Sequence, residues 1–310
     1  MGVAVEGSIR KLREGVTLTE LASLVKGELQ GRDFVVRGVC SARAPRKHCI
    51  GFTNQFSDQL DIKEPTDGVA FLAIPGSVAA VGLSIIHVEN PRRAFRTVAS
   101  YLYVDETKPG IHPTAVVSRM ASVAGDCIVG AFAVIEDGVV LGSGTRIGHH
   151  TVIGANTLIG PGSAVGSHTV IGSSGFGFEY ELDQAWHRIP HVGGVQIGAD
   201  VEIGSCVVIA RGTIDDTVIE DQVKIDDHVF VAHNVRIGKN TLVVAGSELS
   251  GSVTVGEQCW IAPQVAVKNG VTIGANNTIG IGCVVLDDTP DNAVVVGNPG
   301  RILRMKTEVD

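Results

Sequence analysis

The residues best suited to acid–base chemistry lie in the segment Val231-Ala232-His233-Asn234-Val235. An exposed, hydrogen-bonded imidazole titrates near neutral pH and can act as a general base. Asp226 and Asp227 lie about one six-residue step earlier, where a carboxylate could orient the imidazole and stabilise its charged form. The same pattern also fits a surface histidine between polar loops, so both interpretations stand at this point.

His149 and His150 are the other candidates for chemistry, because adjacent histidines on a repeat could bind a metal ion between subunits. A metal site needs three or four converging ligands. No further histidine follows at a matching spacing with acidic support, so we expect no metal site. The sequence also has no nucleophile elbow, P-loop, Rossmann glycine pattern or zinc-ligand spacing.

The element that must position these residues is a six-residue repeat. Aliphatic residues recur at every sixth position from Ile111 to Ile171, at Ile197, Ile203 and Ile209, and again from Ile219 to Val285. Neither a helix nor a simple strand has this period, whereas a parallel β-helix with one inward side chain per flat side does. Three sides per coil and 26 in-phase positions predict between eight and nine coils.

The repeat also places particular residues. His233 lies two positions after the inward Val231, so its side chain should lie outside the packed core. Glycine often follows the inward residue, as at Gly148 and Gly160, where we expect the unusual φ/ψ of a corner.

Two interruptions of the repeat are candidate functional loops, since insertions in repeat proteins often carry function. The second is the short bulge Gly212–Thr217, and the first, Gly172–Val195, carries four aromatic residues: Phe176, Phe178, Tyr180 and Trp186. Aromatic residues on a loop suit a ligand-binding or subunit surface. The alternative is a loop that packs on its own barrel.

The N-terminal part lacks the six-residue period and is expected to be a small α/β domain over residues 17–104, after a tail at 1–16. Its expected elements are a helix N-capped by Thr19, strands at 34–36, 69–74 and 84–88, and a helix that starts at Pro91 after the N-cap Asn90. The β-helix is expected over 105–290 with the inserted loop at 173–196, and a short tail over 291–310.

Composition narrows the class of protein further. The 310-residue chain has a formal net charge of −8 and no long Lys/Arg run, which argues against nucleic-acid binding. We see neither a signal peptide nor a membrane span and expect a cytoplasmic protein. The six cysteines form no CxxC pair, so no disulfide framework is expected, and Cys127, Cys206 and Cys283 should be small buried hydrophobes.

Longer motifs bring a family into view. These motifs are the stretches 175–178, 186–193, 215–219, 224–226, 232–235, 245–246 and 250–252, with 20–22 and 88–91 in the N-terminal part. Over roughly residues 17–285 they resemble the bacterial UDP-3-O-acylglucosamine N-acyltransferases of lipid A biosynthesis, within the hexapeptide-repeat acyltransferase superfamily. The chain differs from that pattern at Ser174 and Ala210, where the family has acids, and at Val271, where it has a histidine.

The resemblance implies a left-handed β-helix that assembles as a homotrimer, with active sites in clefts between subunits. The amine at position 2 of the sugar would attack an acyl thioester on acyl carrier protein, whose phosphopantetheine carries the acyl chain, and no cofactor would be bound permanently. His233 would be the base, Asp226 its supporting acid and the Gly251 N–H the oxyanion donor. The implied substrate-binding residues are Phe52, which stacks on uracil in the N-terminal domain, and Asn54, Phe176, Phe178, Trp186 and His191.

Two other functions remain open. The ending Val294–Arg301 resembles coenzyme A-dependent hexapeptide acetyltransferases, which implies an acyl-CoA or acetyl-CoA donor and another nucleotide aminosugar. If the donor is instead acyl carrier protein, Arg301, Arg304 and Lys306 could form a basic patch that binds it, or they could simply be solvated charges. The third possibility is a catalytically silent scaffold, against which His233, Asp226 and Gly251 argue.

Overall fold

The computed structural model describes residues 10–53, 68–77 and 82–307. The chain divides into two compact units, with the boundary between Thr107 and Lys108. Neither described helix is long and apolar enough to cross a membrane.

The N-terminal unit is a five-stranded sheet with strand order β2-β6-β5-β4-β3, parallel except for the β2–β6 pair. Its strands are β2 (Glu28–Gln30), β3 (Gly38–Val39), β4 (Cys49–Phe52), β5 (Val69–Ala73) and β6 (Leu83–His87). Its helices are α1 (Leu18–Leu24) and α2 (Pro91–Leu102), and β1 (Arg10–Leu12) pairs with β7 (Tyr103–Asp105). All five residues of β5 are buried, and α2 buries Pro91, Ala94, Val98 and Leu102 at helical spacing, so both elements share one apolar core.

Two local predictions for this unit are wrong and the others are confirmed. The N-cap of α1 is Thr17, whose side chain accepts a hydrogen bond from Glu20 N, while the Thr19 hydroxyl donates to Asp33 instead. Residues 34–36 form no strand and contribute only an isolated bridge between Thr17 and Val35. The strands near 69–74 and 84–88 are present, and so is the α2 start at Asn90-Pro91.

The second unit is a left-handed parallel β-helix with three sheets, named here by their first strands. The β8 sheet contains β8 (Gly110–Ile111), β11 (Ile128–Val129), β14 (Arg146–Ile147), β17 (Ala164–Val165), β22 (Glu202–Ile203), β25 (Lys224–Ile225), β28 (Leu242–Val243), β31 (Trp260–Ile261), β34 (Thr278–Ile279), β36 (Ala293–Val296) and β37 (Arg301–Met305). The β9 sheet contains β9 (Val116–Val117), β12 (Val134–Ile135), β15 (Val152–Ile153), β18 (Val170–Ser173), β23 (Val208–Ala210), β26 (Phe230–Val231), β29 (Glu248–Leu249), β32 (Ala266–Val267) and β35 (Val284–Val285). The β10 sheet contains β10 (Ser122–Val123), β13 (Val140–Leu141), β16 (Thr157–Ile159), β21 (Val195–Ile197), β24 (Thr217–Ile219), β27 (Arg236–Ile237), β30 (Thr254–Val255) and β33 (Thr272–Ile273).

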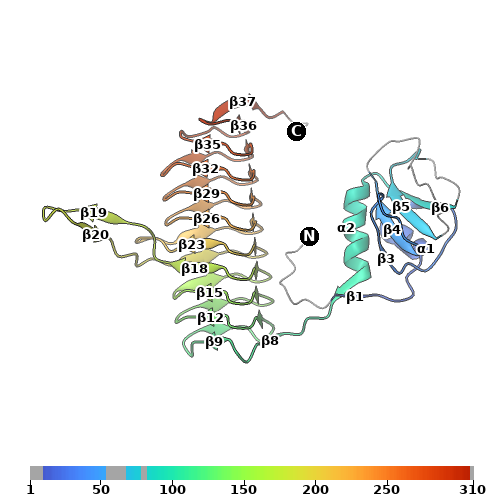
Figure 1. Cartoon of the computed structure of the whole chain (residues 1–310), viewed down its shortest axis with the longest axis horizontal. Coiled ribbons are helices and arrows are strands. Elements are labelled where there is room, and N and C mark those ends of the chain that lie inside the picture. The colour runs from blue at the N-terminus through green and yellow to red at the C-terminus, as the bar shows by residue number, and fades with distance from the viewer. Residues whose placement is uncertain (1–9, 54–67, 78–81, 308–310) are drawn as a thin grey trace. The chain divides into compact units, whose positions relative to one another are not determined.

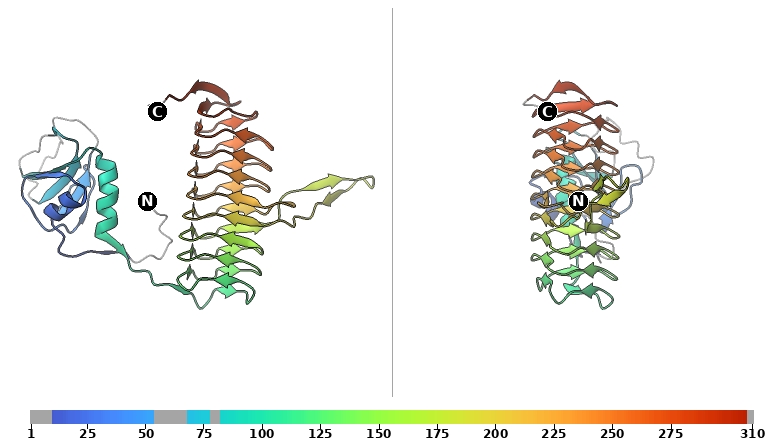
Figure 2. Two further views of the ribbon diagram at one scale, coloured as in Figure 1. Left: turned by 180° about the vertical axis from the view of Figure 1, so that it is seen from behind. Right: turned by 90° about the vertical axis from the view of Figure 1, so that its left-hand side faces the viewer.

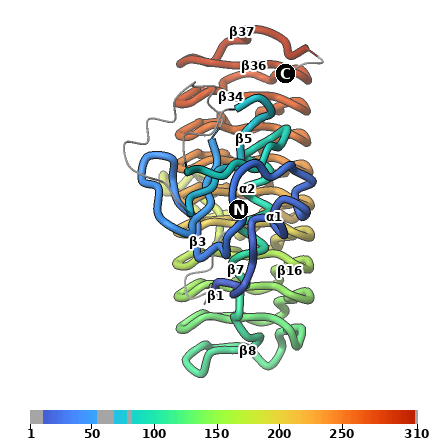
Figure 3. Tube along the Cα trace, turned by 90° about the vertical axis from the view of Figure 1, so that its right-hand side faces the viewer, coloured from blue at the N-terminus to red at the C-terminus, as the bar shows by residue number. Residues whose placement is uncertain are grey.

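The six-residue pattern is confirmed as the inward-facing column of each sheet. Figure 1 shows the coils stacked one above another. From Val129 to Val285 every in-phase aliphatic residue belongs to one buried cluster. Burying a large aliphatic side chain contributes roughly 1.5–3 kcal/mol, so the stacked columns hold the coils together. The core continues past Val285, because Ala293 and Val295 of β36 are also buried and β36 pairs in parallel with β34. The antiparallel strand β37 then closes that end of the β8 sheet (Figure 3).

The glycines after inward residues have a different cause from the one expected. A Cβ at Gly148 would lie 2.6 Å from Gly166 C, and one at Gly160 would lie 2.5 Å from Gly198 C. Close stacking of the next coil therefore excludes a side chain there. The left-handed backbone conformation falls two residues later, for example at His150 with φ 55°.

One cysteine prediction is also wrong. Cys127 and Cys283 are buried, whereas Cys206 is exposed. Cys206 occupies one of these left-handed corner positions (φ 57°), which directs its side chain away from the core.

The first interruption forms an arm, the hairpin of β19 (Phe178–Tyr180) and β20 (Trp186–Arg188). The arm projects away from the coils in opposite views of the molecule (Figures 1 and 2). Its side chains stay exposed: 84% of Phe176, 67% of Trp186 and all of Leu182 is accessible. The hairpin therefore does not pack on its own barrel, whereas the base of the loop does so at His191.

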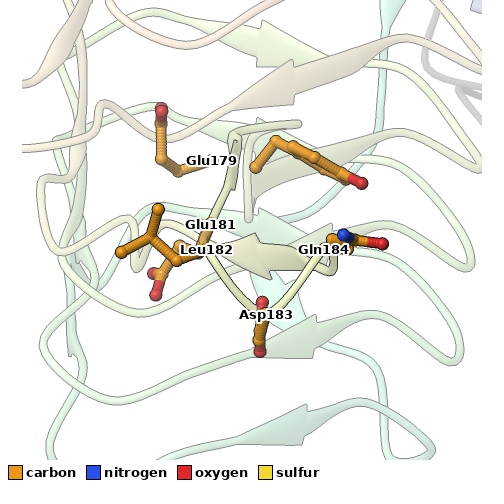
Figure 4. A pocket seen from close by; sticks show the side chains of 6 residues that line it. Glu179, Glu181, Leu182, Asp183 and Gln184 are labelled. Carbon is orange, nitrogen blue, oxygen red and sulfur yellow. The ribbon is translucent and has the colours of Figure 1, made fainter.

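A shallow hollow lies at the tip of the arm, lined by Glu179–Gln184. Its side chains point in different directions and do not converge on a common centre (Figure 4). It shares no lining residue with the cleft described next.

Candidate functional site

A cleft of about 430 Å³ lies on the β9 sheet where β26 ends. Its lining residues are Ser173, Ser174, Gly175, Phe176, Val208, Ala210, Phe230, Ala232, His233, Glu248, Ser250, Gly251 and Asn269. They come from the start of the arm and from successive rungs of the β9 sheet and its following corner. The cleft therefore brings together His233, Gly251 and Phe176, three of the residues predicted for the site.

The hydrogen bonds around His233 define which of its nitrogens can act as a base. Its Nδ1 lies 3.1 Å from Asn234 Oδ1. That amide is itself oriented, because Oδ1 accepts from Thr213 N at 3.1 Å and Nδ2 donates to Asp215 O at 3.0 Å. The Asn234 oxygen is therefore an acceptor, and Nδ1 of a neutral imidazole must carry the hydrogen. This tautomer leaves Nε2 with a free lone pair, as a general base requires.

Gly251 lies directly against this nitrogen. A Cβ at Gly251 would come within 2.8 Å of His233 Nε2 and 2.7 Å of Cε1, so only glycine lets the imidazole occupy its position. With the Asn269 amide oriented to satisfy both groups, its nitrogen donates to Gly251 O at 3.0 Å and its oxygen accepts from Gly270 N at 3.2 Å. No acceptor within residues 10–53, 68–77 and 82–307 engages the Gly251 N–H, which leaves it available to a ligand.

His191, on the return segment of the arm, packs behind His233. The two ring centroids are 5.1 Å apart in an edge-on arrangement. His191 Nδ1 donates to Ile189 O at 3.0 Å, while its buried Nε2 has no partner among the described residues. Burial lowers the pKa of His191, and the positive charges of His233 and two nearby arginines lower it further, against the opposing hydrogen bond to Ile189. These effects favour the neutral form of the ring beside His233.

The two interruptions of the repeat meet at this corner. Val192 N donates to Thr213 O at 2.9 Å and Gly193 N to Gly212 O at 3.1 Å, which joins the return segment of the arm to the Gly212–Thr217 bulge. The same bulge supplies the two backbone groups that hold Asn234. The insertions thus build the support of the base.

Asp226 lies at the preceding corner of the same coil, separated from His233 by β26. Its carboxylate accepts hydrogen bonds from Asp227 N at 2.9 Å and Ala245 N at 3.3 Å. Within one chain the imidazole is oriented by Asn234 rather than by Asp226. The supporting role of Asp226 stays a prediction.

The remaining predicted substrate contacts fall in different places. Phe178 packs on Phe176 at 4.9 Å and under the Arg188 guanidinium at 4.5 Å. Further along the arm, Trp186 packs against Tyr180 with the two rings tilted by 58°. Phe52 belongs to the N-terminal unit, where its half-buried ring packs 4.8 Å from Phe95. Asn54 lies outside the described residues. His191 does not line the cleft, and its role stays a prediction.

The three positions that depart from the family pattern also lie in different places. Ser174 and Ala210 line the cleft, so two acids expected there are replaced by small side chains. Val271 is buried and lies outside the lining.

No group of three or more potential ligands for a metal occurs among the described residues. His149 Nδ1 accepts from Ala131 N at 2.8 Å, and His150 is stacked between Phe132 and His168 at 4.9 Å from each. The pair is thus occupied by contacts within the β-helix.

The sequence interpretation missed Asn234 and Glu248. Asn234 directly follows His233 and has φ 59°, a conformation that asparagine tolerates. Its position in the motif was therefore a usable signal of a residue that supports His233. Glu248 is a charged residue at an outward position of the β9 sheet, where the equivalent residues of the other rungs are apolar.

Comparison with known proteins agrees with this geometry. Residues 120–155 and 216–251 match the bacterial transferase hexapeptide family (six repeats). The UDP-3-O-acylglucosamine N-acyltransferase of Neisseria meningitidis serogroup B is 38% identical over 257 residues, which cover 77% of this chain and 74% of that protein. The enzyme of that name from Coxiella burnetii is 36% identical over 256 residues, 76% and 75% of the two chains.

Solved structures show the same fold. The Arabidopsis UDP-N-acetylglucosamine acyltransferase superposes with a TM-score of 0.54 at 26% identity, over 63% of this chain and 74% of that one. The Campylobacter jejuni UDP-N-acetylglucosamine acyltransferase superposes with a TM-score of 0.58 at 23% identity, over 63% and 75%. The identity and coverage of the Neisseria relative decide the family: this chain is an acyltransferase and belongs to the UDP-3-O-acylglucosamine N-acyltransferase family.

Proposed function

We propose that this enzyme transfers an acyl group from an acyl carrier protein thioester to the 2-amine of UDP-3-O-acylglucosamine, a step of lipid A biosynthesis. The observation that carries the proposal is the free lone pair of His233 Nε2, placed against the Gly251 backbone in an open cleft. We further propose that the working form is a cytoplasmic homotrimer with the cleft completed by a neighbouring subunit.

The proposed reaction needs one base and one oxyanion donor. The amine nitrogen attacks the thioester carbonyl carbon, and the C–N bond forms as His233 Nε2 removes a proton from nitrogen. The Gly251 N–H stabilises the negative oxygen of the tetrahedral intermediate. The C–S bond then breaks, and the imidazolium returns its proton to the thiolate. Asp226 would stabilise that imidazolium.

The acyl donor brings its own phosphopantetheine, so the enzyme needs no permanently bound cofactor. Coenzyme A carries the same arm, and the exposed Arg301 and Arg304 of β37 are the groups proposed to distinguish an acidic carrier protein from it. For the acceptor, we propose that Phe52 stacks on the uracil together with a contact from Asn54. Phe176, Phe178, Trp186 and His191 would shape the sugar and acyl site.

The test measures amide formation on UDP-3-O-acylglucosamine with carrier-protein thioesters and CoA thioesters offered separately. We expect turnover with the carrier-bound donor and a loss of at least about 100-fold in the His233→Asn variant, because general-base catalysis contributes about 10²–10⁴-fold. His228→Asn is the matched control, since His228 is an exposed histidine at the preceding corner of the same coil. Turnover with CoA donors alone would mean that the acyl donor is a CoA thioester and not a carrier-protein thioester. Full activity of His233→Asn would overturn it.

A further inference from the structure

The outward-facing column of the β9 sheet contains one anomaly. Strand pairing places nine outward residues in register, one per rung: Val116, Val134, Val152, Val170, Val208, Phe230, Glu248, Ala266 and Val284. Eight of them are apolar, and Glu248 is the exception. Strands β26, β29 and β32, which carry Phe230, Glu248 and Ala266, lie one above another in the stack (Figure 1).

The anomaly coincides with the cleft. Glu248 lines it together with His233 and is the one acidic side chain among its described lining residues. It lies on the coil that carries Gly251, one rung from Phe230 on the coil that carries His233. A carboxylate at this rung therefore faces the space in front of the base.

The carboxylate of Glu248 has no cationic partner within the described part of the chain. The one side-chain hydrogen bond that it accepts there comes from the Ser250 hydroxyl at 3.5 Å. Its rung neighbours Phe230 and Ala266 are apolar, so a ligand that fills the cleft removes water from the carboxylate without replacing it. Removing water from an unpaired charge is unfavourable unless the ligand brings an opposite charge or hydrogen-bond donors.

We propose that Glu248 binds the acceptor as its ammonium form and holds the nitrogen in front of His233 Nε2. This inference rests on the proposed function, which supplies an amine as the nucleophile. The ammonium nitrogen loses two protons when it becomes an amide nitrogen. One passes through His233 to the thiolate leaving group, and the other is released to water. Glu248 is thus a specificity-determining residue for a cationic acceptor, and it requires no further co-reactant.

The test compares wild type with Glu248→Gln, which keeps the shape of the side chain and removes its charge. Below the pKa of the acceptor amine, we expect KM for the aminosugar to rise about ten- to a hundredfold with kcat nearly unchanged, because a charge-assisted hydrogen bond is lost. The difference should shrink as pH rises and the amine becomes neutral. Glu257→Gln is the matched control, because Glu257 is on the same repeat domain and does not line the cleft.

A neutral acceptor analogue separates charge recognition from packing. UDP-3-O-acylglucose, which carries a hydroxyl in place of the amine, should inhibit wild type and Glu248→Gln with the same Ki. The role of Glu248 would be overturned if Glu248→Gln weakened the binding of the analogue and of the aminosugar equally. It would also be overturned if the change left KM for the aminosugar unchanged at every pH. If wild type itself acylates no UDP-aminosugar, the proposed function fails first, and that outcome is recognised before any variant is compared.

Discussion

At the scale of single residues, the site depends on how His233 is held. The side-chain oxygen of Asn234 accepts a hydrogen bond from His233 Nδ1. Hydrogen bonds to the backbone of Thr213 and Asp215 prevent the Asn234 amide from turning. This support differs from a carboxylate–histidine pair, because a neutral amide orients the ring without adding charge. The lone pair on Nε2 is therefore set by two backbone groups that act through the Asn234 amide.

Removal of the Asn234 side chain tests this arrangement. We expect Asn234→Gly to lower kcat by about ten- to a hundredfold, since a misplaced or wrongly protonated catalytic group costs about that much. Glycine accepts the positive φ of 59°, so the backbone is not strained by the change. Asn240→Gly, at another left-handed corner (φ 56°), is the control and should keep its activity. Equal rates for the two variants would contradict the orienting role.

At the scale of elements, each parallel rung of the β-helix is only two to four residues long, and its stability comes from stacking. The inward residue of each rung contacts its counterparts above and below, while the outward neighbour one position earlier contributes little to the core. The arm lacks such a core, and its short hairpin depends on pairs such as Tyr180–Trp186. The rungs therefore provide the rigid support, and the arm provides the exposed surface near the cleft.

The neighbours Thr272 and Ile273 of β33 separate these contributions. Ile273 is fully buried, so Ile273→Ala should lower the free energy of unfolding by about 2–5 kcal/mol. Thr272 is exposed, and Thr272→Ala should stay within about 0.5 kcal/mol of wild type. Denaturant midpoints with matched slopes measure both changes. A similar loss for the two variants would mean that the inward column is not the main source of stability.

At the scale of the whole molecule, the active region links three segments far apart in sequence. The arm return, the Gly212–Thr217 bulge and the His233 corner are joined by hydrogen bonds and by the His191–His233 contact. His191 is buried in this junction with a lowered pKa. Its protonation state therefore couples the integrity of the junction to pH.

The sign of this coupling follows from the lowered pKa. Below about pH 6.5, the ordinary value for histidine, the unfolded chain binds a proton that folded His191 resists, so the folded state loses stability as pH falls. The melting temperature of wild type should thus fall more between pH 7.5 and 5.5 than that of His191→Gln. His228→Asn should behave like wild type, because His228 is exposed. Parallel curves for wild type and His191→Gln would refute the coupling.

The sequence by itself determined the β-helix, because a period of six over so many repeats is compatible with few other folds. It also predicted a site that contains His233 and Gly251, which lie on motifs with a recognisable family pattern. Both residues line the cleft, and their catalytic roles stay predictions. It placed α2 and the strands β5 and β6 correctly, since these have strong local signals in Asn90-Pro91 and in apolar runs.

Only the tertiary structure decided which groups act on His233. Asp226 is close in sequence but lies across a strand, whereas Thr213, Asp215 and His191 are distant in sequence and lie at the same corner. The reason for the glycines and the isolation of Glu248 in an apolar column likewise emerge when coils stack. Contacts of this kind join residues that are about one coil or more apart in the sequence. The local conformational preferences of the chain therefore do not determine where the irregular insertions contact the coils.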